Sequence, residues 1–168
     1  MKGLIGYRIL TYILLPIELL LGFMALIMLL VALANPAALL PVFLLSCTVI
    51  YVFCSFTFLK KGIDNAKPCK KSLKDWIKVN AYVSIAFCSL SIAQSVSLLI
   101  NPALINEAMT NAIEMQKSTM PSQITPALMM QVMKGVLIFM LCFSAGLSIH
   151  IFSTFRLLKQ YDHVFDKE

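Results

Sequence analysis

The chain has 168 residues, of which 60% are hydrophobic and only 13% are charged, and its formal net charge is +6. Soluble globular domains carry about 25% charged residues, so this composition excludes an ordinary water-soluble globule. It also excludes a disordered chain, because so apolar a sequence cannot remain solvated and open. With a mean hydropathy of +0.85, these values indicate a single membrane domain over residues 1–168.

Four apolar stretches are long enough to cross a bilayer, whose core of about 30 Å needs about 20 helical residues. They cover residues 9–34, 38–59, 76–100 and 135–158. Glu18 is the one charged residue of the first stretch, and the second stretch has none. Lipid offers no water to the backbone, so we expect helices and not barrel strands. The predicted fold class is an all-α transmembrane four-helix bundle.

Basic residues gather on one side of the expected spans. Seven lysines lie between residues 60 and 78, and only two aspartates accompany them. The N-terminal flank adds Lys2 and Arg8, whereas the connection 35–41 on the other side is uncharged. The positive-inside rule therefore places both termini and the lysine loop in the cytoplasm of a multi-pass cell-membrane protein. By analogy, the short inner tails favour a bacterial inner membrane.

Two stretches of the chain resemble two later ones, which predicts a duplicated helical hairpin with halves of about 1–66 and 67–168. The similar pairs are 33–37 with 99–103, at an offset of 66 residues, and 51–60 with 150–159, at an offset of 99. Such halves would be related by a pseudo-two-fold axis along the membrane normal, as in parallel-repeat transporters. Chance similarity is the alternative, because aromatic-then-lysine helix ends are common at membrane interfaces.

The growth of the offset from 66 to 99 leaves extra residues in the second half, over about 102–134 on the outer side. Asn101-Pro102 and Thr125-Pro126 are each typical of an N-cap followed by proline at the first helical position. We expect an extracytoplasmic helical cap here. We also expect the fourth helix to begin at Pro126 and to project beyond the membrane.

Glu18 and His150 are the ionisable residues well inside the predicted spans. A carboxylate in that position costs a few kcal/mol, so it should face the bundle and have a partner, or be protonated. Counting rises from the cytoplasmic ends places both residues in the same half of the membrane, so a hydrogen bond between them is feasible. They are the candidate intramembrane polar pair, either as a proton site or as a link that only holds two helices together.

Two further sets of residues are candidates. Small and hydroxyl side chains at helical spacing in the third span indicate close helix packing, or alternatively a polar pathway. Lysines around the start of that span, with a tryptophan anchor, are candidate contacts to lipid head groups, or alternatively only fix the topology. The first set is Asn80, Ser84, Ser91, Gln94 and Ser95, and the second is Lys70, Lys71, Lys74, Trp76 and Lys78.

No motif supports catalysis. The sequence has no Cys-x-x-Cys pair, Walker loop, nucleophile elbow or dinucleotide glycine pattern, so we predict no enzyme activity and no cofactor. Outer-side methionines could bind Cu(I), but without an outer histidine or cysteine they are better explained as apolar filler, and no metal site is predicted. A membrane carboxylate in the first of four spans also occurs in small multidrug-resistance transporters, but the 102–134 insert separates this chain from them, and no family is identified.

The function predicted is that of a membrane protein acting by interaction, as a subunit or scaffold of a membrane assembly. Its partners would be the lipid bilayer and another membrane protein or a second copy of the chain, with no nucleic acid. The alternative is a small oligomeric transporter or proton-coupled carrier that uses Glu18 and His150. Four helices with so few inward polar groups make a poor pathway alone, so a carrier should be at least a dimer.

Overall fold

The computed structural model describes residues 2–101, 103–107, 110–111 and 126–165, and all regular structure within these residues is helical. Two elements are short 3-10 helices, η1 and η3, and η2 is a π-helical continuation of α2. In chain order the elements are α1 (Lys2–Ala34), η1 (Pro36–Ala38), α2 (Leu39–Thr57), η2 (Phe58–Asp64), α3 (Lys71–Ile100), α5 (Pro126–Gln160) and η3 (Asp162–Val164).

Four of these helical segments have the length and apolarity to cross a membrane, as predicted. They are Leu4–Ala34, Pro36–Asp64, Lys71–Ile100 and Leu128–Gln160. Only 17–28% of their most apolar windows is buried within the chain, so most of their apolar side chains face outward. A soluble protein would bury such surface, whereas lipid solvates it. The chain is thus an all-helical protein compatible with a membrane helical bundle.

One predicted boundary differs in the structure and another is confirmed. The second helix does not end at Leu59 but continues to Asp64 through the wide π turn, which the side chain of Asn65 closes by donating to the Lys60 carbonyl at 2.8 Å. The fourth helix begins at Pro126, as expected. Of the predicted cap, residues 102, 108–109 and 112–125 lie outside the described residues, so the cap stays a prediction.

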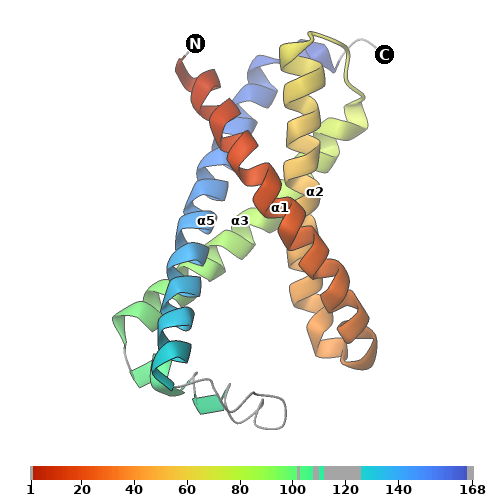
Figure 1. Ribbon diagram of the computed structural model, residues 1–168. Helices are drawn as coiled ribbons and strands as arrows, with labels where there is room; N and C mark the ends of the chain where they lie inside the picture. Colours follow the sequence, from red (N-terminus) through yellow and green to blue (C-terminus); the bar gives the residue numbers. More distant parts are fainter. Residues whose placement is uncertain (1, 102, 108–109, 112–125, 166–168) are drawn as a thin grey trace. The chain divides into compact units, whose positions relative to one another are not determined.

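The chain divides into two compact units, residues 1–87 with 146–168, and residues 88–145. In the first unit, α1 and α2 form an antiparallel hairpin whose helices cross and meet at the turn that contains η1 (Figure 1). Asn35 shapes this turn, because its side-chain oxygen accepts the Ala37 amide at 3.2 Å and Pro36 follows at the first helical position. Asn35 and Pro36 thus show the N-cap and first-position proline geometry that the sequence predicts for the similar pair Asn101-Pro102.

Close approach of α1 to α2 depends on Gly22. A Cβ atom at this position would lie 3.3 Å from Cγ1 of Val49 on α2, which is tighter than ordinary van der Waals contact. In lipid there is little hydrophobic drive between helices, so small residues that let backbones approach are a main source of packing energy. Gly22 therefore holds the two helices of the hairpin together.

We predict that Gly22→Val lowers the free energy of unfolding by about 1–3 kcal/mol, because the added methyl groups force α1 away from Val49. Reversible denaturation in mixed detergent micelles measures the change. The matched control is Gly6→Val in the same helix, since nothing lies within 4 Å of a Cβ built on Gly6. Equal stability of the two variants would contradict a close packing role for Gly22.

Candidate functional site

A buried cluster of polar side chains joins three helices of the first unit. Each helix contributes two residues four positions apart, which places both on one helix face. Every member is at most 2% exposed. The members of this polar network are Tyr7 and Thr11 on α1, Tyr51 and Ser55 on α2, and His150 and Thr154 on α5.

His150 is at the centre of the polar network. Its Nε2 lies 2.9 Å from the Thr11 hydroxyl, and its Nδ1 lies 2.8 Å from the Tyr51 hydroxyl. The Tyr7 ring stacks on the imidazole with centroids 4.7 Å apart and planes 13° from parallel. Both ring nitrogens thus have hydroxyl partners, and one face of the imidazole is stacked against Tyr7.

The remaining hydroxyl groups satisfy one another. Tyr51 Oη lies 2.7 Å from Thr154 Oγ1, and Tyr7 Oη lies 2.6 Å from Ser55 Oγ. Thr154 also donates to the His150 carbonyl of its own helix at 2.9 Å. An unsatisfied polar group costs several kcal/mol in a hydrocarbon environment. The mutual hydrogen bonds of the six side chains offset this cost of burying them.

Glu18 is fully buried but belongs to a different hydrogen-bond group. Its Oε2 accepts from Thr48 on α2 at 3.3 Å, and the same hydroxyl donates to the Leu45 carbonyl at 2.8 Å, so one hydrogen is shared between two acceptors. The second carboxyl oxygen, Oε1, has no hydrogen-bond partner among the described residues. Glu18 therefore has the least satisfied polar group of this hairpin.

The structure does not bring Glu18 and His150 together in a hydrogen bond. His150 bonds at the level of Thr11, and Glu18 lies seven residues further along α1, which is about 10 Å of helix rise. Each residue instead finds a hydroxyl partner on a neighbouring helix. Their joint action as a proton site stays a prediction.

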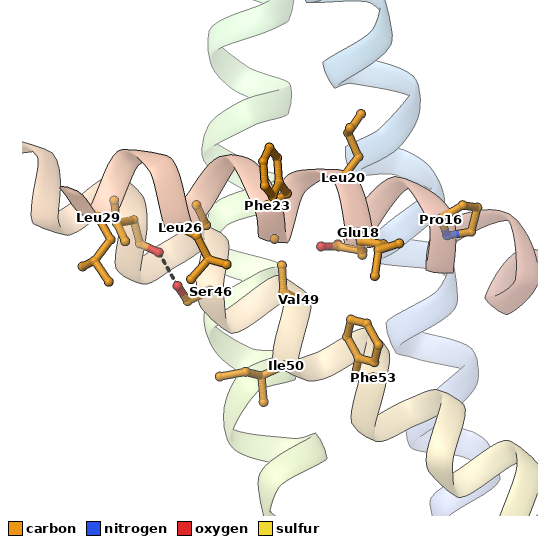
Figure 2. A pocket seen from close by; sticks show the side chains of 14 residues that line it. Pro16, Glu18, Leu20, Phe23, Leu26, Leu29, Ser46, Val49, Ile50 and Phe53 are labelled. Carbon is orange, nitrogen blue, oxygen red and sulfur yellow. Dashed lines mark hydrogen bonds between the residues drawn. The ribbon is translucent and has the colours of Figure 1, made fainter. Parts of the chain in front are cut away.

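An apolar groove of about 860 Å³ lies between α1 and α2, on the half of the hairpin nearer the η1 turn (Figure 2). Glu18 lies near the end of the groove that is farther from the η1 turn. Gly22 and Val49 form its narrow floor, where the two helices approach each other most closely. Bulky side chains form its walls. They are Leu19, Leu20, Phe23, Leu26 and Leu29 on α1, with Ile50 and Phe53 on α2.

The predicted stripe of α3 is in part a set of local hydrogen bonds. Asn80 donates to the Trp76 carbonyl at 2.8 Å and Ser84 donates to the Asn80 carbonyl at 2.7 Å, so both are buried and satisfied within their own helix. In the second unit, Ser95 is buried, Ser91 is half-buried and Gln94 is exposed. The choice between helix packing and a polar pathway for this stripe stays a prediction.

The predicted head-group residues lie around the start of α3. Lys70, Lys71 and Trp76 are exposed there, and Lys74 and Lys78 are half-buried. Three ion pairs surround this end of the first unit: Arg8 with Asp64 at 2.6 Å, Lys60 with Asp64 at 3.8 Å, and Lys74 with Asp162. The hydrogen bond from Lys74, with the charges of Lys78 and His163 nearby, holds the pKa of Asp162 below its ordinary value.

Comparisons with known proteins add no family to what the structure shows. No protein-family model, curated protein or solved structure matches this chain. What the described residues do show is four helices long and apolar enough to cross a membrane, which is compatible with a membrane helical bundle.

Sequence reasoning missed five of the six members of the polar network. A signal for them is present, because Tyr7 with Thr11, Tyr51 with Ser55 and His150 with Thr154 repeat the same spacing of four in otherwise apolar helices. Hydroxyl side chains are common enough in membrane helices that the spacing alone does not say which pairs meet.

We predict that Tyr51→Phe lowers the free energy of unfolding by about 1–3 kcal/mol, because it leaves buried His150 and Thr154 atoms without their shared partner. Detergent unfolding measures this loss. A double-mutant cycle with His150→Leu should give a coupling energy of about 0.6–1.7 kcal/mol. Tyr82→Phe is the control, since Tyr82 is 66% exposed and should change little. Zero coupling, or equal losses at both tyrosines, would contradict the network.

Proposed function

We propose that this chain is a non-enzymatic integral membrane protein that acts by interaction, as a subunit or scaffold of a larger membrane assembly. The observation that carries the proposal is the contrast between a closed polar network and an open apolar groove in the same unit. The network residues are buried and bonded to one another, and none of them lines the groove. Polar groups so fully engaged stabilise a fold and are poorly placed to pass a substrate.

The groove supplies the contact surface for such a partner. Its walls include Phe23 and Leu26, each more than 60% exposed, over a floor narrowed by Gly22. A membrane partner would fill the groove by van der Waals packing, which is a main source of helix association in lipid. The occupant under this proposal is a transmembrane helix of another protein or of a second copy.

A second candidate function is a proton-coupled carrier, and one observation favours it. Glu18 Oε1 is buried without a hydrogen-bond partner among the described residues, and the carboxyl group lies at the inner end of the groove. A carboxyl group left partly unsatisfied inside a membrane is a functional-site hypothesis by default. His150 has both ring nitrogens occupied, so Glu18 carries this alternative alone.

The proposal includes the duplicated hairpin, and contacts within the first unit support it. Residues matched at the offset of 99 contact each other: Tyr51 bonds its counterpart His150, and Ser55 lies 3.4 Å from its counterpart Thr154. Residues that meet their own counterparts lie on a two-fold axis. The matched basic residues Arg8 and Lys74, at the offset of 66, likewise each pair with an aspartate of the following helical end, as noted above.

The turns give a further match. Asn101 accepts the Ala103 amide at 3.1 Å, as its counterpart Asn35 accepts the Ala37 amide. Equivalent residues thus make equivalent bonds at both ends of the alignment, which chance similarity does not require.

We also propose an orientation in the membrane, on the basis of the positive-inside rule. The lysine-bearing end and both termini face the cytoplasm, in a cell membrane of the bacterial inner-membrane kind.

We predict that gentle extraction of the full chain from its own membrane and native mass spectrometry give a reproducible mass excess equal to one further polypeptide. Leu26→Ala with Leu29→Ala, which trims the groove wall, should weaken this complex about tenfold or more without unfolding the chain. Leu30→Ala with Leu33→Ala is the matched control, because both are exposed on the same helix outside the groove. A bare monomer, or equal weakening by both pairs, would overturn the proposal.

The carrier alternative has its own test. In proteoliposomes with a trapped pH-sensitive dye, the carrier predicts proton entry after an acid pulse, and Glu18→Gln abolishes that entry while the fold is retained. Proton entry no faster than in empty liposomes would remove the alternative. Entry that persists in Glu18→Gln would remove Glu18 from it.

A further inference from the structure

We propose that a pocket between α3 and α5 binds the phosphate of an anionic phospholipid head group. The pocket has a volume of about 420 Å³ and lies in the first unit, at the end that carries the lysines. Its walls bring together charged residues from both helices and from the turn after α5. We call it the lysine pocket, and the residues that matter here are Lys74, Lys78, Tyr82, Phe155, Lys159 and Asp162.

The charges of the lysine pocket do not cancel. Three lysines face one aspartate, and that aspartate is engaged by Lys74. Among the described residues no carboxylate oxygen lies within 4.0 Å of the ammonium group of Lys78 or of Lys159, although Lys78 is near enough to Asp162 for their charges to interact. Two ammonium groups therefore remain for an outside anion, and a phosphate offers the strong acceptor oxygens that lysine binds as a point charge.

The depth and the apolar part of the pocket favour a lipid over a soluble phosphate. Lys78 lies seven residues into α3, which is about 10 Å from the helix start. Tyr82 follows one turn deeper, with its ring 5.4 Å from that of Phe155. Lysines with their ammonium groups at head-group level above an aromatic floor match a molecule with a charged head and an apolar chain. A soluble phosphate would leave the aromatic floor unused.

The corresponding end of the α1–α2 hairpin carries a cluster in which both cations are ion-paired. There Asp64 pairs with Arg8 at 2.6 Å and with Lys60 at 3.8 Å. Lys60 also lies over the Tyr12 ring, 5.2 Å from its centroid. That cluster keeps one positive charge in excess and each of its cations has a carboxylate partner, whereas the lysine pocket keeps two positive charges in excess and two of its lysines are outside the ion pairs. The difference assigns the anion site to the pocket and not to the whole basic end.

The test uses the full chain in phosphatidylcholine nanodiscs into which phosphatidylglycerol is titrated, with bound lipid counted by native mass spectrometry. Lys78→Gln with Lys159→Gln should lower phosphatidylglycerol affinity by about 10- to 30-fold. Lys78→Arg with Lys159→Arg should retain it. The charge-matched control is Lys61→Gln with Lys67→Gln, two exposed lysines of the same end outside the pocket, which should lower affinity by less than about threefold.

Three results would overturn the proposal. Equal losses in the pocket pair and the control pair would mean that the basic end attracts anionic lipid diffusely. Equal binding of phosphatidylcholine would mean that the phosphate is not recognised through its net charge. Displacement of phosphatidylglycerol by inorganic phosphate at millimolar concentration would mean that the ligand is a soluble anion. Circular dichroism and melting of each variant confirm that the lysine substitutions leave the helices intact.

Discussion

Polar groups buried in an apolar medium must be satisfied within the protein, and this requirement fixes how α1, α2 and α5 meet. Apolar side chains pack against lipid almost as well as against another helix, so they specify the arrangement weakly. The polar network specifies it strongly, because His150 can satisfy both ring nitrogens only where Thr11 and Tyr51 reach it from two different helices. A rotation of any of the three helices would leave several buried groups unpaired at once.

The sequence was sufficient to predict the helical architecture. The long apolar stretches and the helix start at Pro126 follow from hydropathy and from the chemistry of caps, which are local properties. The π-helical end of α2 was not predicted. A Cβ atom built on Gly62 would lie 3.1 Å from the Phe58 ring of the same turn and 3.3 Å from Sγ of Cys69, so the turn depends on a glycine and on the path of the loop that follows, and the hydropathy pattern reports neither.

The candidate site was predicted only in part, for a physical reason. Ionisable residues attract attention in a membrane segment because they are costly to bury, so Glu18 and His150 were selected as a pair. Hydroxyl groups are cheap to bury and numerous, yet they are the partners that both residues use. Residue counting places each residue only relative to the end of its own helix, and this does not decide whether two side chains touch. The separation of seven residues along α1 between Thr11 and Glu18 decides it.

The polar network and the groove lie in different halves of the α1–α2 hairpin, and each half is stabilised in a different way. The half with the polar network is tied to α5 by directional bonds, so its geometry does not depend on what surrounds it. The half near η1 is held by close packing at Gly22 and Val49, with an open apolar face beside it. A partner in the groove therefore meets a hairpin whose crossing is already set, and loses little conformational entropy in ordering it. Glu18 lies where the two halves meet and is the fully buried polar residue among those that line the groove in the described part of the chain, so a partner there would change its environment directly.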